Sequence, residues 1–428
     1  MPVLILIVLL VLVAAAVPVA AVLGILSLAL DELFLSGRRS LMIGDFIWEQ
    51  SNEYILVAIP MFILLGEIML RAGIAVRMYN AVIQWLSWLP GGLMHANIGT
   101  SAIFAASSGS SVATAATVGT VSYPEIDKRH YNERLFLGSL AAGGTLGILI
   151  PPSINLILYG LLTDSSVPEL YLAGIVPGLI LAGIFILVIL VSCLYRKQWG
   201  GTKVETSWRA RIRCLPDLIP PLLLFMAVVG SIYAGVATPT EAASVGVVLA
   251  LVIAAVNRTL SISMLRDAFE GTMRTSAMIM LIILAAVFLN FILGFLGVTK
   301  AILDTIAVLG LSSMQTMLVI IVFYVLLGMF METFSMMLTT IPVVFPIVIE
   351  MGFDPIWFGI LITVLMETAL ITPPIGVNLY VVHGIRTRGG DFNDVSIGAL
   401  PFVIAMFIMI ALLLVYPQLA IWLPQQFY

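Results

Sequence analysis

Long apolar runs constrain this chain more than any other feature of its sequence. Several runs reach the ~18 to 20 apolar residues that a helix needs to cross a bilayer, the first of them within residues 1–30. Hydrophobic residues make up 61% of the 428 residues and charged residues only 10%, against about a quarter in soluble domains. The first run exceeds a signal-peptide core and has no basic residue before it, so we interpret it as a retained span. The composition predicts an all-α polytopic membrane protein.

Two further apolar stretches, 94–123 and 315–349, carry small, hydroxyl or proline residues near their middle. This pattern favours re-entrant helical hairpins, which enter and leave the membrane on one side, over simple spans. The predicted crossings are residues 3–30, 53–70, 135–160, 168–194, 215–236, 240–256, 276–296, 356–382 and 400–424.

The basic residues give these segments an orientation. With the N-terminus in the cytoplasm, all of the 19 Lys and Arg residues except Arg38, Arg39 and Lys300 fall on the inner side, as the positive-inside rule requires. A single crossing at either hairpin would swap the sides of every later loop. The first hairpin is therefore predicted to open to the cytoplasm and the second to the periplasm or exterior, where the C-terminus also lies.

Two proline doublets, Pro151-Pro152 and Pro373-Pro374, interrupt apolar segments. Each doublet follows the proline that closes a hairpin stretch, Pro124 or Pro346, after the same interval of 27 residues. One shift of 222 residues relates both sets, although few residue identities accompany it. Because the hairpins open to opposite sides, the halves are predicted to be inverted repeats. Secondary transporters commonly have this build, with their binding site near mid-membrane.

Proline removes a backbone donor and clashes with the preceding turn, so each doublet is predicted to unwind its helix and free backbone carbonyls. Freed carbonyls and hydroxyls are hard oxygen ligands for alkali cations, and half-helix N-termini favour a carboxylate. We therefore expect each hairpin tip to form an alkali-cation site with the nearby break, the second tip including Glu332. The predicted cation ligands, which are sodium ligands if the resemblance given below holds, are Ser108, Gly109, Ser110, Gly147, Ile150 and Pro152 at the first break, and Gly328, Thr333, Thr368 and Thr372 at the second. Asn155 and Asn378 follow the breaks and are predicted to donate to a polar substrate.

Structural alternatives exist for each of these features. A proline in a membrane helix is often only a kink, and the small residues 107–111 also suit close helix packing. Carboxylates within or beside apolar segments are functional by default; four occur here, at Glu67, Glu241, Glu332 and Glu367. Capping or buried hydrogen bonding is the alternative for Glu67 and Glu241.

No enzymatic motif accompanies these features, and we expect neither catalysis nor a bound cofactor. Cys193 and Cys214 form no CxxC pair. The sequence contains no GxxxxGK[ST] motif and no Gly-x-Ser-x-Gly elbow. Energy is therefore expected from an ion gradient or a partner.

At these residues the sequence resembles the large membrane subunit (M subunit, DctM-like) of tripartite ATP-independent periplasmic (TRAP) transporters. Glu332 stands where the family usually has Asp, and Thr114 where many members have Asp. The resemblance rests on 59-IPMFILLGEIMLRAGIA-75, 90-PGGLMHANIGTSAIFAASSGSSVATAA-116, 144-GTLGILIPPSINLILYG-160, 235-GVATPTEAASVG-246, 328-GMFMETFSMMLTTIP-342, 371-ITPPIGVNLYVV-382 and the C-terminal 400–424. We assign substrate binding to Ser110, Thr114, Asn155, Glu332 and Asn378.

This resemblance implies a sodium symporter that imports an organic acid, such as a sialic acid or a C4-dicarboxylate, across a bacterial or archaeal inner membrane. It implies two partners, a periplasmic substrate-binding protein (P subunit) and a small four-helix membrane subunit (Q subunit). A stand-alone sodium/anion symporter and an ion channel remain the alternatives.

The family is also similar in architecture to elevator-type symporters of divalent anions. By that likeness, residues 94–160 and 315–384 form the two halves of a moving transport domain. Residues 1–93, 161–311 and 385–428 form the scaffold, with lateral helices at about 38–52, 73–90, 258–274 and 297–311.

Overall fold

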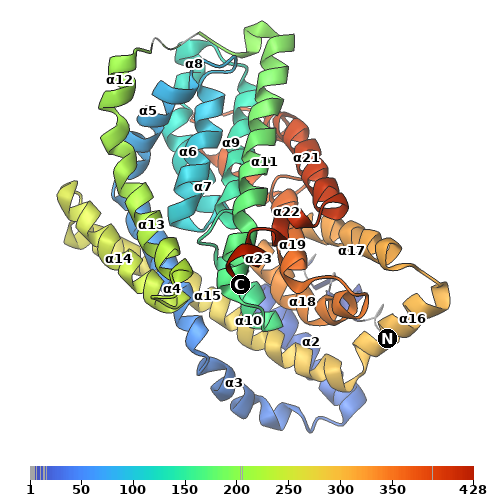
Figure 1. Cartoon of the computed structure of the whole chain (residues 1–428). Coiled ribbons are helices and arrows are strands. Elements are labelled where there is room, and N and C mark those ends of the chain that lie inside the picture. Colours follow the sequence, from blue (N-terminus) through green and yellow to red (C-terminus); the bar gives the residue numbers. More distant parts are fainter. Residues whose placement is uncertain are drawn as a thin grey trace.

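The computed structural model of the chain is all-helical in the part that it describes (Figure 1). It describes residues 5, 7–9, 11, 12, 15, 17–202, 204, 206–387 and 389–428. Part of the predicted first crossing, together with Lys203 and Arg388, lies outside these residues. Within residues 3–30 the structure describes most of α2 (Val19–Leu35).

The helices reproduce both predicted hairpins and both broken helices. The first hairpin is α6 (Leu93–Ser108) and α7 (Ser111–Ser122), and the second is α17 (Ser313–Gly328) and α18 (Thr333–Glu350). The broken helices are α9 (Glu133–Leu149) with α10 (Ile154–Thr163), and α19 (Pro355–Leu370) with α20 (Val377–Gly384). The remaining longer helices are α3 (Ile43–Ser51), α4 (Ala58–Arg71), α5 (Ile74–Leu86), α11 (Val167–Tyr195), α13 (Ile219–Tyr233), α14 (Pro239–Val256), α15 (Ile262–Phe295), α16 (Val298–Leu309) and α21 (Phe392–Val415). Short helices complete the chain: α8 (Glu125–Arg129), α12 (Trp208–Arg213), α22 (Gln418–Ile421), α23 (Pro424–Phe427) and four 3₁₀ turns.

Seven described helices are long and apolar enough to cross a membrane, or eight if α9 and α10, bent by 42°, count as one span. These candidates overlap seven of the predicted crossings. The crossing at 356–382 is not among them, because α19 ends at Leu370 after 16 residues. Helix α18 passes the same test of length and composition, although we predict that it is one arm of a hairpin.

Helix α15 corrects one prediction. The lateral helix at 258–274 and the crossing at 276–296 were expected to be separate, but the structure has one continuous helix of 34 residues. No proline interrupts this stretch, and its charged residues 266–274 do not stop the backbone hydrogen bonding of a helix. At 1.5 Å per residue, α15 is roughly 50 Å long and exceeds the ~30 Å hydrocarbon core of a bilayer.

Helix α9 lies at the centre of the packing. Every residue from Leu135 to Leu149 is buried, and α6, α7, α11, α19, α20 and α21 all contact this helix. Helix α21 approaches most closely, since a side chain at Gly138 would collide with the Gly398 carbonyl group. Residues 385–428, predicted to belong to the scaffold, therefore include the helix that packs most tightly along α9.

The second arms of the broken helices are exchanged between the halves. Helix α10 packs against α18 of the second hairpin, and α20 packs against α7 of the first. The first arms, α9 and α19, stay with their own hairpins and also contact each other. The two halves consequently share one core rather than forming two separate bundles.

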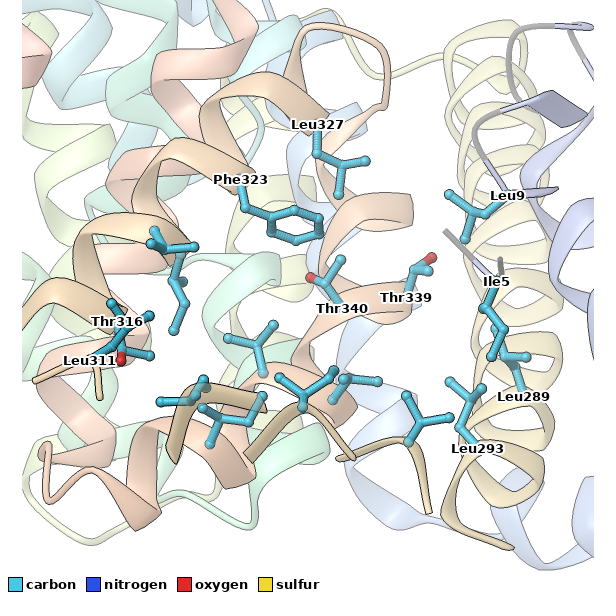
Figure 2. A pocket seen from close by; sticks show the side chains of 18 residues that line it. Ile5, Leu9, Leu289, Leu293, Leu311, Thr316, Phe323, Leu327, Thr339 and Thr340 are labelled. Carbon is cyan, nitrogen blue, oxygen red and sulfur yellow. The ribbon is translucent and has the colours of Figure 1, made fainter. Parts of the chain in front are cut away.

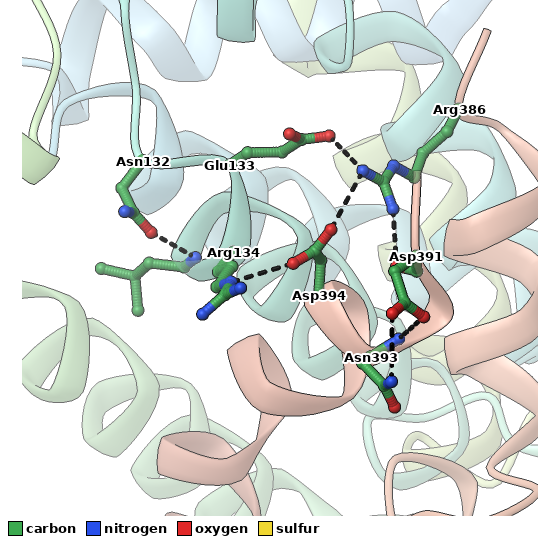
Figure 3. Close-up of polar contacts among 8 residues, drawn as sticks. Asn132, Glu133, Arg134, Arg386, Asp391, Asn393 and Asp394 are labelled. Carbon is green, nitrogen blue, oxygen red and sulfur yellow. Dashed lines mark hydrogen bonds and ion pairs between the residues drawn. The ribbon is translucent and has the colours of Figure 1, made fainter. Parts of the chain in front are cut away.

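An ionic cluster joins the halves at the start of α9 and the end of α20, the ends of the broken helices away from the proline doublets (Figure 3). Arg386, just after α20, contacts Glu133 at 2.7 Å and Asp394 at 3.5 Å, and Arg134 contacts Asp394 at 2.9 Å. The Arg386 side chain is only 3% exposed. Burial opposes its charge, but Glu133, Tyr123 and Asp394 together outweigh burial and raise the pKa of Arg386. The cluster ties the start of α9 to the end of α20.

Candidate functional site

The turn of the first hairpin is built from hydroxyl groups and a glycine. Gly109 has the left-handed conformation, φ +60°, which glycine adopts without steric cost. Ser110 then caps α7 by accepting a hydrogen bond from the Ala113 amide. The Ser108 hydroxyl lies 3.0 Å from the Thr114 hydroxyl, which donates to the Ser110 carbonyl at 2.8 Å. Three uncharged side-chain oxygens therefore gather at this tip.

The first broken helix ends where its sequence removes backbone donors. A helix would bond the carbonyls of Gly147 and Ile148 to residues 151 and 152, which are prolines without an N–H group. Helix α9 stops at Leu149, and the Ile150 amide donates to the Leu146 carbonyl. The chain restarts as α10, capped by the Ser153 hydroxyl.

The structure brings this hairpin tip and this break together, as predicted. A Cβ atom at Gly147 would lie 2.6 Å from the Ser110 carbonyl oxygen, and one at Gly109 would lie 2.9 Å from the Pro152 carbonyl oxygen. Only glycine permits such an approach of two backbones. The predicted ligands Ser108, Gly109, Ser110, Gly147 and Pro152 thus form one contiguous group, and Ile150 lies within the same break.

The second tip is assembled differently, because Glu332 caps α18. Its carboxylate accepts hydrogen bonds from the amides of Phe334 and Ser335 at 3.1 and 3.2 Å, and from the Ser335 hydroxyl at 3.1 Å. The Thr333 hydroxyl donates to the same carboxylate at 3.4 Å. Glu332 is predicted to bind substrate. In this conformation its carboxylate oxygens instead accept hydrogen bonds from its own hairpin.

The second break lies against the end of α17. A side chain at Gly328 would collide with Ala369 in the last turn of α19. Thr372 follows this turn and donates through its hydroxyl to the Thr368 carbonyl at 2.6 Å, while Thr368 donates to Val364 at 2.7 Å. Each hydroxyl thus keeps its lone pairs free to accept or to ligate.

The two asparagines after the breaks occupy different surroundings. Asn155 is buried, and both polar atoms of its side chain lack a hydrogen-bond partner. Asn378 donates to the Ala141 carbonyl of α9 at 3.3 Å, while its carbonyl oxygen lacks a partner. Asn378 therefore reaches across to the first half, which its position in the sequence did not indicate.

The remaining acidic residues of the apolar segments separate into two kinds. Glu67 pairs with Arg71 on the same helix, and Glu241 forms a capping box with Thr238 at the start of α14. Glu241 therefore has the capping role of its structural alternative, whereas Glu67 forms a partly buried ion pair within its own helix. Glu367 differs, because it is fully buried and neither carboxylate oxygen has a hydrogen-bond partner.

A cavity of about 360 Å³ lies elsewhere, between the second hairpin and α15 and α16 (Figure 2). Thr316, Thr339 and Thr340 are its only polar lining residues among those that the structure describes. Thr340 already bonds to Tyr324 at 2.5 Å. Such a lining suits hydrocarbon rather than an organic acid or a cation, so the paired tips and breaks remain the candidate site.

Comparison with known proteins identifies the family of this chain. The model of the tripartite ATP-independent periplasmic transporter, DctM component, matches residues 6–419. The chain is 34% identical over 401 residues to the C4-dicarboxylate TRAP transporter large permease protein DctM of Pseudomonas aeruginosa, covering 93% of each chain. It is 30% identical over 379 residues to the sialic acid TRAP transporter large permease protein SiaM of Vibrio cholerae, covering 88% of this chain and 87% of that one.

A solved structure shares the fold. The crystal structure of the YdaH transporter of Alcanivorax borkumensis superimposes with a TM-score of 0.67 over 97% of this chain and 98% of that one, at 15% identity. At this identity the likeness concerns the fold alone. The family match over nearly the whole chain confirms the resemblance seen in the sequence. The chain belongs to the DctM family and is a multi-pass large permease subunit of a TRAP transporter.

Proposed function

We propose that this permease imports an organic acid by sodium symport. The observation that carries the proposal is the contact of the first hairpin tip with the first break, where backbone carbonyls and hydroxyls converge without a basic side chain. Oxygen ligands of this kind suit sodium. The names of the relatives, which include C4-dicarboxylate and sialic acid permeases, support an organic acid as the substrate.

Two sodium sites follow from the paired breaks. The first consists of Ser108, Gly109 and Ser110 with the carbonyls around Gly147 and Ile150. The second consists of Gly328, Thr333, Thr368 and Thr372. Sodium bound at both sites orders the hairpin tips and offsets the charge of the anion, so cation and substrate raise each other's affinity by the same factor.

The substrate is proposed to bind between the two tips. The side chain of Asn155 and the side-chain carbonyl oxygen of Asn378 have no hydrogen-bond partner and can bind the substrate. The N-terminus of α7, near Ser110 and Thr114, favours a carboxylate. Because Glu332 already occupies the N-terminus of α18, the α7 end is the more accessible of the two for an anion.

The transport movement is proposed to be of the elevator type. The packing described above groups α6, α7, α9 and α10 with α17 to α20, and α21 follows α9 through the Gly138–Gly398 contact. We therefore include α21 in the moving domain and keep residues 1–93 and most of 161–311 as the scaffold.

The tripartite family implies partners for this subunit. We propose a periplasmic binding protein that delivers the substrate and a small four-helix membrane subunit. The location is a bacterial or archaeal inner membrane with a cytoplasmic N-terminus and a periplasmic C-terminus. The inner position of most basic residues supports this orientation.

The decisive experiment is uptake into proteoliposomes that contain the permease and the small subunit. Uptake of the ligand of the cognate binding protein is expected only with that protein outside and with an inward sodium gradient. Replacing sodium by choline should abolish uptake. Uptake without the binding protein favours a stand-alone symporter, and currents that do not saturate favour a channel; either result contradicts the proposal.

A further inference from the structure

The apolar cavity of Figure 2 takes no part in the proposed sodium and substrate sites. It has a volume of about 360 Å³ and lies between the second hairpin and the pair α15 and α16. Phe323 of α17 and Val344 of α18 belong to its hairpin wall, and Leu293 of α15 and Ile302 of α16 belong to the opposite wall. Helix α18 also contacts both α15 and α16, so these helices enclose the space. A ligand here would touch the proposed moving domain and the proposed scaffold together.

The lining of this cavity has little capacity for hydrogen bonding. The Thr339 hydroxyl donates to the Ser335 carbonyl at 2.6 Å, and the Thr340 hydroxyl donates to the Met336 carbonyl at 2.7 Å. Both protons are therefore used within α18. Among the lining residues that the structure describes, only Thr316 retains a hydroxyl without a partner, and none is charged. A buried water needs about two to four polar partners, so water and ionised ligands are unfavourable occupants.

The size of the cavity indicates which apolar group fits. An empty space destabilises a protein more as its volume grows, because the side chains around it lose contacts on one side. An engineered apolar cavity of about 150 Å³ binds benzene, which has six carbon atoms. By proportion, a volume of about 360 Å³ accommodates on the order of 14 carbon atoms. This is the scale of most of one lipid acyl chain.

The cavity adjoins an outer surface that suits the bilayer. Val319 lines the cavity and is nevertheless 57% exposed. Leu318 and Val322, its neighbours on α17, are exposed as well, and so are Val308 and Leu309 at the end of α16. In a multi-pass membrane protein, exposed apolar side chains of this kind contact the hydrocarbon core of the bilayer. At Val319 the cavity is therefore continuous with a lipid-facing surface, and an acyl chain can enter from the side.

We propose that this cavity binds one acyl chain of a membrane phospholipid, inserted between the second hairpin and the helices α15 and α16. Apolar contacts are non-directional, so the chain fills the space without fixing the hairpin to the scaffold through hydrogen bonds. The hairpin can then slide past α15 and α16 while its outer side stays packed. This consequence for movement rests on the proposed elevator mechanism, whereas the binding site itself does not.

Photolabelling by a lipid tests the site. The full-length permease is reconstituted in nanodiscs that contain phosphatidylcholine with a diazirine near the middle of one acyl chain, and labelled residues are identified by mass spectrometry after irradiation. We expect label on Val344 and Leu293, which line the cavity and are only 8% and 6% exposed. Val348 is the control, because it is buried on the same helix α18 but does not line the cavity. It should remain unlabelled.

A variant that fills the cavity distinguishes a bound chain from lipid that only surrounds the protein. Val344→Phe places a larger side chain in the space between α18 and α15. We expect it to lower the labelling of Leu293 at least fivefold. Val322→Phe is the matched control, since it makes the same substitution at an exposed position of α17 that does not line the cavity. The labelling of Leu293 should be unchanged in this control.

Two results would overturn the inference. One is label confined to exposed residues such as Leu318 and Val319, and the other is equal labelling of Leu293 in the wild type and in Val344→Phe. If Val344→Phe does not fold, Val343→Phe, at a partly exposed lining position, replaces it. A fivefold fall then supports the inference, and unchanged labelling overturns it. The labelling needs neither sodium nor substrate, so it is independent of whether sodium-driven uptake succeeds or fails.

Discussion

The two halves of the candidate site share a backbone plan but differ in charge. The 222-residue shift places the cap of α18, Glu332, on the cap of α7, Ser110, and places Glu367 on Thr145. The first half thus has hydroxyls at the positions where the second has carboxylates. Each tip still meets a proline-broken helix through a glycine, Gly147 or Gly328. The comparison indicates that backbone oxygens recur in both halves, whereas carboxyl groups at these positions belong to one.

The largest effect is expected at the glycine contacts. Gly147→Val would push a branched side chain into the Ser110 backbone, and overpacking of this kind costs about 1–3 kcal/mol or more. We expect sodium-dependent uptake to fall below a tenth of wild type. Gly328→Val should have a similar effect, because the Ala369 Cβ that it would meet is fixed to its backbone and cannot rotate away. Gly183→Val is the control, since its Cβ would meet nothing within 4 Å. Equal uptake by Gly147→Val and this control would refute the close contact.

The next largest effect is expected from removal of the residues that cap α7 and α18. The two removals should differ in their effect on stability. Glu332→Ala removes a charged acceptor from two amides and a hydroxyl, and each such bond is worth about 1.5–3 kcal/mol. Ser110→Ala removes one longer bond of 3.4 Å, worth about 1 kcal/mol. The thermal unfolding temperature should therefore fall further in Glu332→Ala than in Ser110→Ala. Equal unfolding temperatures for the two variants would contradict the expected difference between the two hairpin tips.

Breaking the ionic cluster tests how much it contributes to the stability of the joined halves. Arg386→Met leaves Glu133 without its partner, but Glu133 is 43% exposed and Asp394 keeps Arg134, so the expected loss is about 1–2 kcal/mol. Arg274→Met breaks an exposed pair with Glu270 and should cost less than about 1 kcal/mol. Denaturant unfolding of both variants checks the order, and a larger loss for Arg274→Met would contradict it.

The smallest effects are expected for single hydroxyl ligands. Ser108→Ala and Thr372→Ala each remove one neutral oxygen, worth about 1 kcal/mol, or about fivefold in sodium affinity. The sodium dependence of uptake, compared with unfolding temperature, should show affinity falling more than stability. Unchanged sodium dependence in both variants would remove these residues from the sites.

Local chemistry explains why the hairpins and breaks were predictable from the sequence. The prolines at 151, 152, 373 and 374 lack donors wherever the chain folds, so α9 and α19 end within a few residues of the expected points. The polar tips were equally visible as hydroxyl and glycine residues in apolar surroundings. Boundaries of the C-terminal helix were less accurate, since α21 spans Phe392–Val415 rather than 400–424.

Contacts between distant segments were not predictable in this way. Asn378 bonds Ala141 across 237 residues, and Glu367 lies against Ile148 only because α9 and α19 cross. No periodicity within either helix encodes that crossing. The continuity of α15 was missed for another reason: its charged stretch was interpreted as a boundary, whereas charged residues are good helix formers.

The exchanged arms also bear on how such a chain is made. Helix α7 ends at Ser122, but α20, which packs on it, begins at Val377. More than 200 residues separate α7 from α20, so α20 covers the first hairpin late in synthesis. Until then the insertion machinery or surrounding lipid has to shelter that hairpin. A nascent chain stalled before α19 should therefore remain protease-sensitive at α7 and become resistant there only once α20 has been synthesised.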